Sequence, residues 1–231
     1  MIEIFFWPSI NGSKVVVFCE AAGLAYRVRP VNIEAGEQFD DAFLALSPAN
    51  KVPAIVHHRE DGERVALFES AAILLYLAET FDCLRGGAGD RVQVLQWLIF
   101  ASASMGPYLG QAYHFRNNAP DRHAYAIERY SREAARLAQI VDRRLDRHEF
   151  LGCDRFSIAD IAAYPWLARW QKLGIDAEAL PNLRRWLGVV AALPAVERGM
   201  AVLAEMQRTG PMSAETWEIY YGESQRRQRL G

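Results

Sequence analysis

The chain has 231 residues, of which 51% are hydrophobic and 23% are charged, a composition typical of a globular protein long enough for two domains. The formal net charge is −2, and no basic run stands outside helical patterns, so we expect no nucleic-acid partner. No apolar run is long enough to span a bilayer, and the chain begins with a strand-like pattern rather than a signal peptide. We therefore expect no membrane partner.

The cysteine pattern predicts a reducing compartment. Cys19, Cys83 and Cys153 are far apart and odd in number, so they form neither a disulfide framework nor a metal-binding spacing. We expect a cytoplasmic protein without a metal ion.

The N-terminal part alternates strand and helix patterns. Apolar and β-branched runs predict strands at residues 2–7, 25–30, 53–57 and 64–68, the last two joined by a turn at 59–62. Helices are expected from Gly12 to a C-terminal cap at Gly23 and over 69–80, with an irregular or helical crossover at 31–46. The order βαβ followed by αββα predicts a thioredoxin-like domain of the α/β class.

The C-terminal part carries only helical patterns. Apolar spacings of three and four predict helices at 91–105 and 125–148, and Ser157 with Asp160 has the form of a capping box before an apolar helix. We predict a thioredoxin-like domain at 1–82, a linker at 83–90, an all-helical domain at 91–208 and a polar tail at 209–231.

Two short segments of the first domain predict a peptide-binding site. Pro53 opens a strand, and a cis bond in a tight turn there would leave the backbone of Val52 free to pair with an extended peptide. Glu69 and Ser70 stand where a strand becomes a helix, whose first N–H groups favour a carboxylate. A small peptide with a negative end that fits both segments is glutathione.

These motifs also resemble a known family. Ser47-Pro48 ahead of Val52-Pro53, Phe68-Glu69-Ser70 and the late capping box, in this order, resemble the glutathione transferase superfamily. Further segments, at 8–12, 106–107 and 125–130, are similar to its bacterial Nu-class group. The resemblance implies a homodimeric, glutathione-dependent disulfide-bond oxidoreductase that binds two glutathione molecules, or one oxidised glutathione, per site.

The loop before the first helix lacks the cysteine pair that thioredoxins carry there, so glutathione must supply the thiolate. Ser9 and Asn11 are the candidates to hydrogen-bond that sulfur, because a donated hydrogen bond favours the charged thiolate. The alternative is that both residues only cap the helix. Cys19 lies inside the helix and is expected to be a small buried hydrophobe.

The remaining candidates would hold the ends of glutathione. Glu69 suits the ammonium and Ser70 the carboxylate of the γ-glutamyl end, while Val52, beside Pro53, would pair with the cysteinyl backbone. Gln38 would reach the glycyl end and Lys51 could assist it, although loop residues of these types are usually just solvated.

The resemblance adds Arg129, which would reach a glutathione carboxylate either in its own subunit or across the dimer interface. Without the resemblance, a surface ion pair would be the ordinary interpretation of this residue.

Three functions fit this site. The leading hypothesis is thiol–disulfide exchange by bound glutathione on a small-molecule or peptide disulfide. The alternatives are conventional conjugation of glutathione to an electrophile and a non-catalytic, glutathione-binding regulatory protein.

Overall fold

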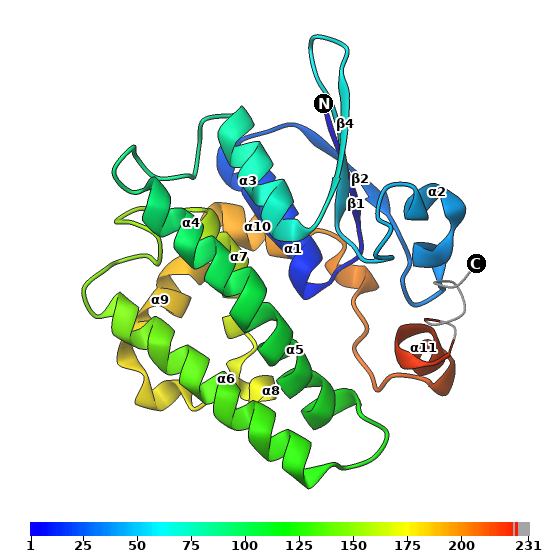
Figure 1. Cartoon of the computed structure of the whole chain (residues 1–231), viewed down its shortest axis with the longest axis vertical. Coiled ribbons are helices and arrows are strands. Elements are labelled where there is room, and N and C mark those ends of the chain that lie inside the picture. The colour runs from blue at the N-terminus through cyan, green and yellow to red at the C-terminus, as the bar shows by residue number, and fades with distance from the viewer. Residues whose placement is uncertain (224, 226–231) are drawn as a thin grey trace. The chain divides into compact units, whose positions relative to one another are not determined.

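The computed structural model describes residues 1–223 and 225, which contacts divide into two compact units (Figure 1). The first unit combines residues 1–73 with the chain from Gly199 onward, and the second is formed by residues 74–198. The C-terminal stretch thus packs with the N-terminal part of the chain.

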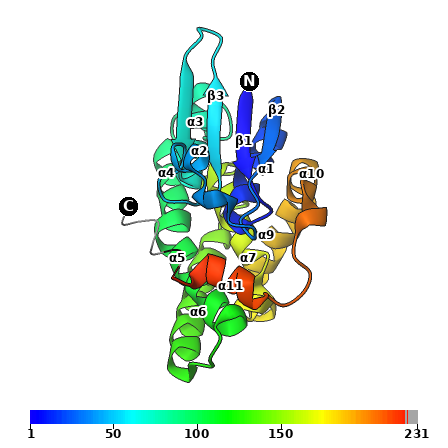
Figure 2. The same ribbon diagram turned by 90° about the vertical axis from the view of Figure 1, so that its right-hand side faces the viewer.

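The first unit is built on a four-stranded sheet in the order β2-β1-β3-β4 (Figure 2). The elements follow the predicted order: β1 Ile2–Phe6, α1 Ile10–Ala22, β2 Tyr26–Pro30, α2 Asp41–Leu44, β3 Ala54–His58, β4 Arg64–Phe68 and α3 Ser70–Thr80, of which residues 74–80 belong to the second unit. β1 is parallel to β2 and antiparallel to β3, and β3 forms an antiparallel hairpin with β4. The predicted thioredoxin-like arrangement is confirmed.

Two glycines shape the first βα unit. A Cβ at Gly12 would lie 2.4 Å from the ring of Phe6 and 2.8 Å from the carbonyl oxygen of Trp7, so only glycine lets α1 approach β1 this closely. Gly23 ends α1 as predicted, in the left-handed conformation with φ 64°. The first helix is therefore fixed against the sheet at one end and stopped at the other.

The crossover between β2 and β3 is partly helical. It contains a 3-10 turn, Glu37–Phe39, followed by α2. Phe43 of α2 packs in a small core with Val31 and Ala54, which ties the crossover to the sheet.

The second unit is all helical, as predicted. Its helices are α4 Arg91–Ile99, α5 Gly106–Tyr113, α6 Ala124–Leu145, α7 Ile158–Leu167, α8 Trp170–Leu173, α9 Pro181–Ala191 and the part of α10 Pro194–Ala201 up to Arg198. A π-helical segment, Phe100–Met105, joins α4 to α5, and a second one, His114–Asn118, extends α5, so the helical stretch is longer than the predicted 91–105. A last helix, α11 Ala214–Tyr221, lies in the first unit.

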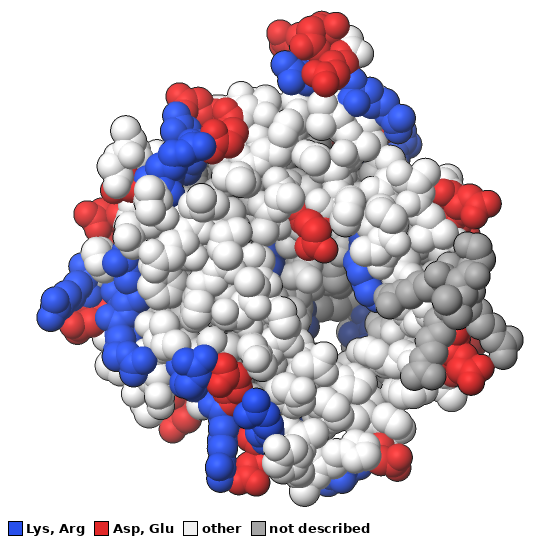
Figure 3. Space-filling model, viewed as in Figure 1, with Lys and Arg blue, Asp and Glu red and all other residues white. Residues whose placement is uncertain are grey.

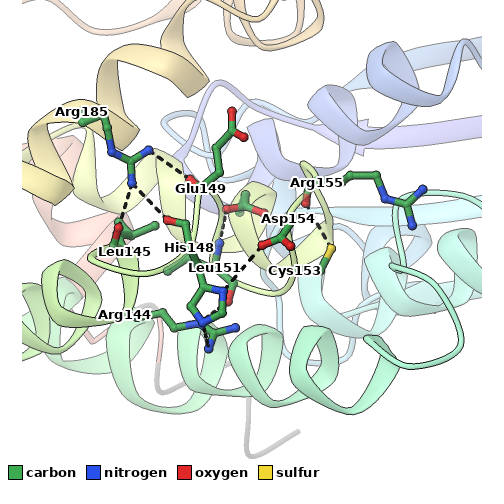
Figure 4. A network of polar contacts seen from close by, with 10 residues as sticks. Arg144, Leu145, His148, Glu149, Leu151, Cys153, Asp154, Arg155 and Arg185 are labelled. Atoms are coloured by element: carbon green, nitrogen blue, oxygen red, sulfur yellow. Dashed lines mark hydrogen bonds and ion pairs between the residues drawn. The ribbon is translucent and has the colours of Figure 1, made fainter.

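Side chains cap the end of α6 (Figure 4). Arg185 Nη2 donates hydrogen bonds to the carbonyl oxygens of Leu145 at 2.9 Å and His148 at 3.1 Å. Arg144 Nε donates to the carbonyl oxygen of Leu151 at 2.9 Å. The Leu145 carbonyl group, which the helix end leaves unpaired, is satisfied in this way, and the other two hydrogen bonds hold the segment that follows α6.

The predicted capping box is present at the start of α7, and Asp160 is its centre. This fully buried carboxylate accepts hydrogen bonds from Leu151 N and Trp186 Nε1 at 2.9 Å each, and from the backbone N–H and hydroxyl of Ser157. Burial raises the pKa of Asp160 to about 6, although these donors oppose the rise. The carboxylate thus joins α7, α9 and the loop before α7.

Charges of both signs are interspersed on the face shown in Figure 3. Along α6, for example, Arg132 pairs with Glu128 and Arg136 with Glu133. Within the described part of the chain, no helix is both long and apolar enough to cross a membrane.

We predict that Asp160→Asn destabilises the protein. If the amide nitrogen replaces Oδ2, it places an N–H donor opposite the N–H donor of Ser157, and neither has an acceptor. A buried donor without an acceptor lowers the free energy of unfolding by about 1–3 kcal/mol. Urea unfolding at pH 7.5 measures the loss. Asp146→Asn, which changes an exposed carboxylate, is the control. Equal stability of both variants would contradict the central role of Asp160.

Candidate functional site

The strand register brings three predicted site segments to one edge of the sheet. Ala54, the first residue of β3, pairs with Phe5 on one side and with Phe68 on the other. The chain therefore leaves β1, enters β3 and leaves β4 at the same edge. Because β2 is parallel to β1, the crossover also begins there, and Val31 N donates to the carbonyl oxygen of Phe6 at 3.0 Å.

The first segment is the start of α1. Ser9 is the N-cap, and its hydroxyl oxygen accepts a hydrogen bond from Gly12 N at 3.2 Å. Asn11 is exposed in the first turn, and its side chain forms no hydrogen bond with the residues that the structure describes. Ser9 thus caps α1, which was the alternative role considered for it, whereas the amide of Asn11 is available to a ligand.

The second segment enters β3. The Val52–Pro53 peptide bond is cis. Within the described ranges, neither the N–H nor the carbonyl group of Val52 has a hydrogen-bond partner. Lys51 is exposed, and its own carbonyl oxygen accepts a hydrogen bond from the Ser47 hydroxyl at 2.8 Å. The backbone of Val52 is therefore open to an added strand.

The third segment joins β4 to α3. Glu69 has a left-handed backbone with φ 69°, which is rare for a residue with a side chain and concentrates at functional sites. Its carbonyl oxygen accepts the hydrogen bond of Ile73 N, and its side chain is exposed. Ser70 is buried at the first position of α3. A helix start with free N–H groups is suited to a carboxylate.

Lys14 is a charged residue of this region that the sequence analysis missed. It lies on α1 one turn after Asn11 and is only 2% exposed. Burial lowers its pKa to about 8, and the charge of Glu69 opposes this fall. The signal in the sequence is a lysine directly before the apolar run 15–18, on a helix that packs against the sheet.

Gln38 and Arg129 occupy different units. Gln38 is buried in the 3-10 turn of the crossover, and its Oε1 has no hydrogen-bond partner among the described residues. Arg129 is exposed on α6 in the second unit. There the pKa of Glu133 is lowered, mainly by its hydrogen bond with Arg136 and less by the charge of Arg129.

The three cysteines lie outside the segment 8–12 that leads into α1. Cys19 is fully buried in the helix, as expected, and none of the three forms a disulfide. Residues 1–223 with 225 contain no group of three His, Cys, Asp or Glu side chains that could hold a metal ion. No thiol of the chain therefore lies in the loop that would hold a reactive sulfur.

We predict a pH-dependent stability effect of Lys14. Below pH 8 the buried ammonium is charged in both states, so it destabilises the folded protein. Between pH 8 and 10.5 the folded protein loses this proton before the unfolded chain does, and the penalty disappears. The stability advantage of Lys14→Met over the wild type should therefore shrink by about 3 kcal/mol across this range.

Urea unfolding of both proteins at pH 7.5, 9 and 10.5 measures this difference. Lys172→Met, which changes an exposed lysine, should show no such trend and serves as control. A constant difference between Lys14→Met and the wild type would refute the depressed pKa.

Comparisons with known proteins identify the family. Residues 8–80 match the glutathione S-transferase N-terminal domain, and residues 100–194 match the glutathione S-transferase C-terminal domain. The chain is 43% identical over 206 residues to the disulfide-bond oxidoreductase YfcG of Escherichia coli K12, covering 88% of this chain and 95% of that protein.

Solved structures are similar over most of the chain. A glutathione transferase of Pseudomonas putida, with one glutathione disulfide bound per subunit, superimposes with a TM-score of 0.83 at 32% identity and covers 87% of this chain and 91% of its own. One from Burkholderia graminis, with two glutathione molecules per subunit, gives 0.82 at 34% identity and covers 86% and 87%. The chain belongs to the glutathione S-transferase family.

Proposed function

We propose that this protein is an enzyme, a glutathione-dependent disulfide-bond oxidoreductase in which bound glutathione supplies the reactive thiolate. The observation that carries the proposal is the convergence, at one sheet edge, of a cysteine-free helix start, the open backbone of Val52 and the start of α3. The oxidoreductase name of the E. coli relative and the glutathione disulfide bound by the P. putida relative support this reaction.

The start of α1 holds the sulfur. The Ser9 hydroxyl already accepts a hydrogen bond from Gly12, but its proton remains available to donate to a thiolate. The amide of Asn11 donates a second hydrogen bond. Together with the positive end of the α1 dipole, these donors stabilise the charged sulfur and lower the pKa of the bound thiol.

The remaining site residues hold the peptide. Val52 pairs with the cysteinyl backbone, Ser70 binds the γ-glutamyl carboxylate, and Glu69 binds the ammonium. Gln38 would hold the glycyl end, where a peptide N–H of the ligand would satisfy its Oε1, which has no partner among the described residues. Lys51 adds a positive charge near the glycyl carboxylate.

The reaction is a pair of thiol–disulfide exchanges. The glutathione thiolate attacks one sulfur of a small-molecule or peptide disulfide, forms a mixed disulfide and releases the other half as a thiolate. A second glutathione thiolate then attacks the glutathione sulfur of the mixed disulfide, which yields glutathione disulfide and releases the second half. The protein contributes orientation and thiolate stabilisation rather than a nucleophile.

Four finer assignments belong to the same proposal. The protein is of the Nu-class group, works in the cytoplasm, where its free cysteines stay reduced, and forms a homodimer. Arg129 binds a glutathione carboxylate, because its exposed guanidinium forms no ion pair within the described residues and is available to an anion.

Asn11→Ala should lower kcat/KM for the glutathione-dependent reduction of 2-hydroxyethyl disulfide about tenfold to a hundredfold, because the thiolate loses a charge-assisted hydrogen bond. Asn182→Ala, which changes an amide on α9, is the matched control and should leave the rate unchanged. The proposal is refuted if the wild-type protein lacks this activity or if Asn11→Ala leaves kcat/KM unchanged.

The same proteins should be assayed with an aryl halide. A higher rate with the halide than with the disulfide would indicate a conventional transferase instead. Glutathione binding without turnover of either substrate would indicate a regulatory binding protein.

Arg129→Ala should weaken the binding of glutathione disulfide about tenfold, the loss expected for one hydrogen-bonded charge pair. Isothermal titration calorimetry gives the dissociation constants. The control is Arg132→Ala, since Arg132 lies on the same helix and is 79% exposed. Equal affinities of the two variants would assign Arg129 to the solvated surface of α6.

A further inference from the structure

The end of the chain forms a strap on the first unit, made of residues 208–223 and Gln225. It contains α11, whose N-cap Ser213 accepts a hydrogen bond from Thr216 N at 3.1 Å. The strap lies outside the two stretches that match the family domains, 8–80 and 100–194. It nevertheless packs with the sheet domain, near the crossover that bears α2 (Figures 1 and 2).

Glu34 of the crossover is the first anchor of the strap. Arg208 Nη1 lies 3.2 Å from Glu34 Oε1, and both side chains are 28% exposed. The guanidinium carbon of Arg208 also lies 6.0 Å from the centre of the Tyr220 ring. Tyr220 in turn interacts with Glu34: burial first, and then the charge of this carboxylate, raise the pKa of the Tyr220 phenol. One carboxylate thus holds two side chains of the strap.

Lys51 is the second anchor. Its Nζ lies 3.5 Å from Gln225 Oε1, while Gln225 Nε2 donates to the carbonyl oxygen of Ile219 at 2.9 Å. The contact is long and exposed, so it is weaker than the one at Glu34. It connects the strap to the residue directly before Val52.

The two anchors lie on either side of Gln38 in the chain. Glu34 precedes the 3-10 turn that buries Gln38, and Lys51 follows the crossover. The strap therefore restrains both ends of the segment whose side chains would hold the glycyl end of glutathione. Arg208 also compensates the charge of Glu34, which would otherwise repel a carboxylate that approaches this segment.

We propose that the strap preorganises Gln38 and Lys51 for the glycine residue of glutathione, with Arg208 and Tyr220 as positioning residues that act through Glu34. This inference rests on the proposed glutathione site but not on its catalytic activity. It makes the strap a determinant of specificity for the full tripeptide, because the γ-glutamyl and cysteinyl parts are held elsewhere.

The test compares glutathione with γ-glutamylcysteine, which lacks the glycine. Arg208→Gln and Tyr220→Phe should each weaken glutathione binding about three- to tenfold, as expected when the order of a binding loop is lost, and leave γ-glutamylcysteine binding unchanged. Calorimetry measures both dissociation constants. Because the two residues share Glu34, the double variant should lose little more than the worse single variant.

Controls separate positioning from folding. Arg208→Lys should retain most of the affinity, and Arg147→Gln, which changes an 88% exposed arginine, should retain all of it. With 2-hydroxyethyl disulfide as substrate, KM for glutathione should rise in Arg208→Gln while kcat stays within about twofold. This pattern is expected when a variant weakens the binding of glutathione equally in the ground state and in the transition state.

The outcomes distinguish the two proposals. If the wild type binds glutathione but reduces no disulfide, the proposed function fails and the binding comparison still decides the role of the strap. If the variants keep the glutathione affinity of the wild type, or lose equal affinity for both peptides, only the proposed role of the strap is refuted. A wild type that binds neither peptide would overturn both.

Discussion

The antiparallel pairing of β3 between β1 and β4 is the constraint on which the site depends. Because Ala54 is held by Phe5 on one side and Phe68 on the other, the residues next to these three in the chain must meet at one sheet edge. Pro53 cannot donate to a ladder, so pairing ends there. A shift of one residue in this register would turn every buried side chain of β3 to the opposite face.

The parts of the fold that were predictable from the sequence have local causes. Gly23 ends α1 because glycine tolerates the left-handed conformation, and the Ser157–Asp160 box starts α7 because both side chains bond backbone N–H groups close by. The β3–β4 hairpin is likewise predicted by the residues of its turn, 59–62. The continuation of α4 through one π-helical segment into α5, and of α5 into a second, has no comparable local signal, and the predicted helix is correspondingly short.

The site was predictable only in part, for the same reason. Residue types at a helix start predicted Ser9, Asn11, Glu69 and Ser70, but the burial of Lys14 depends on packing between distant segments. The left-handed backbone of Glu69 and the contacts of the strap with Glu34 are also set by tertiary structure. Long-range contacts of this kind leave no periodicity in one sequence.

The charges around the site are arranged asymmetrically. At the start of α3 the charge of the exposed Glu69 interacts with the buried Lys14, so the lysine offsets part of that negative charge without offering its ammonium to solvent. At the crossover side the exposed Lys51 is positive, and Glu34 is neutralised by Arg208 of the strap. A ligand with an ammonium at one end and carboxylates at both ends matches this arrangement as long as Arg208 remains paired with Glu34. In the proposed role of the strap, its Arg208 is thus part of the electrostatics of the candidate site.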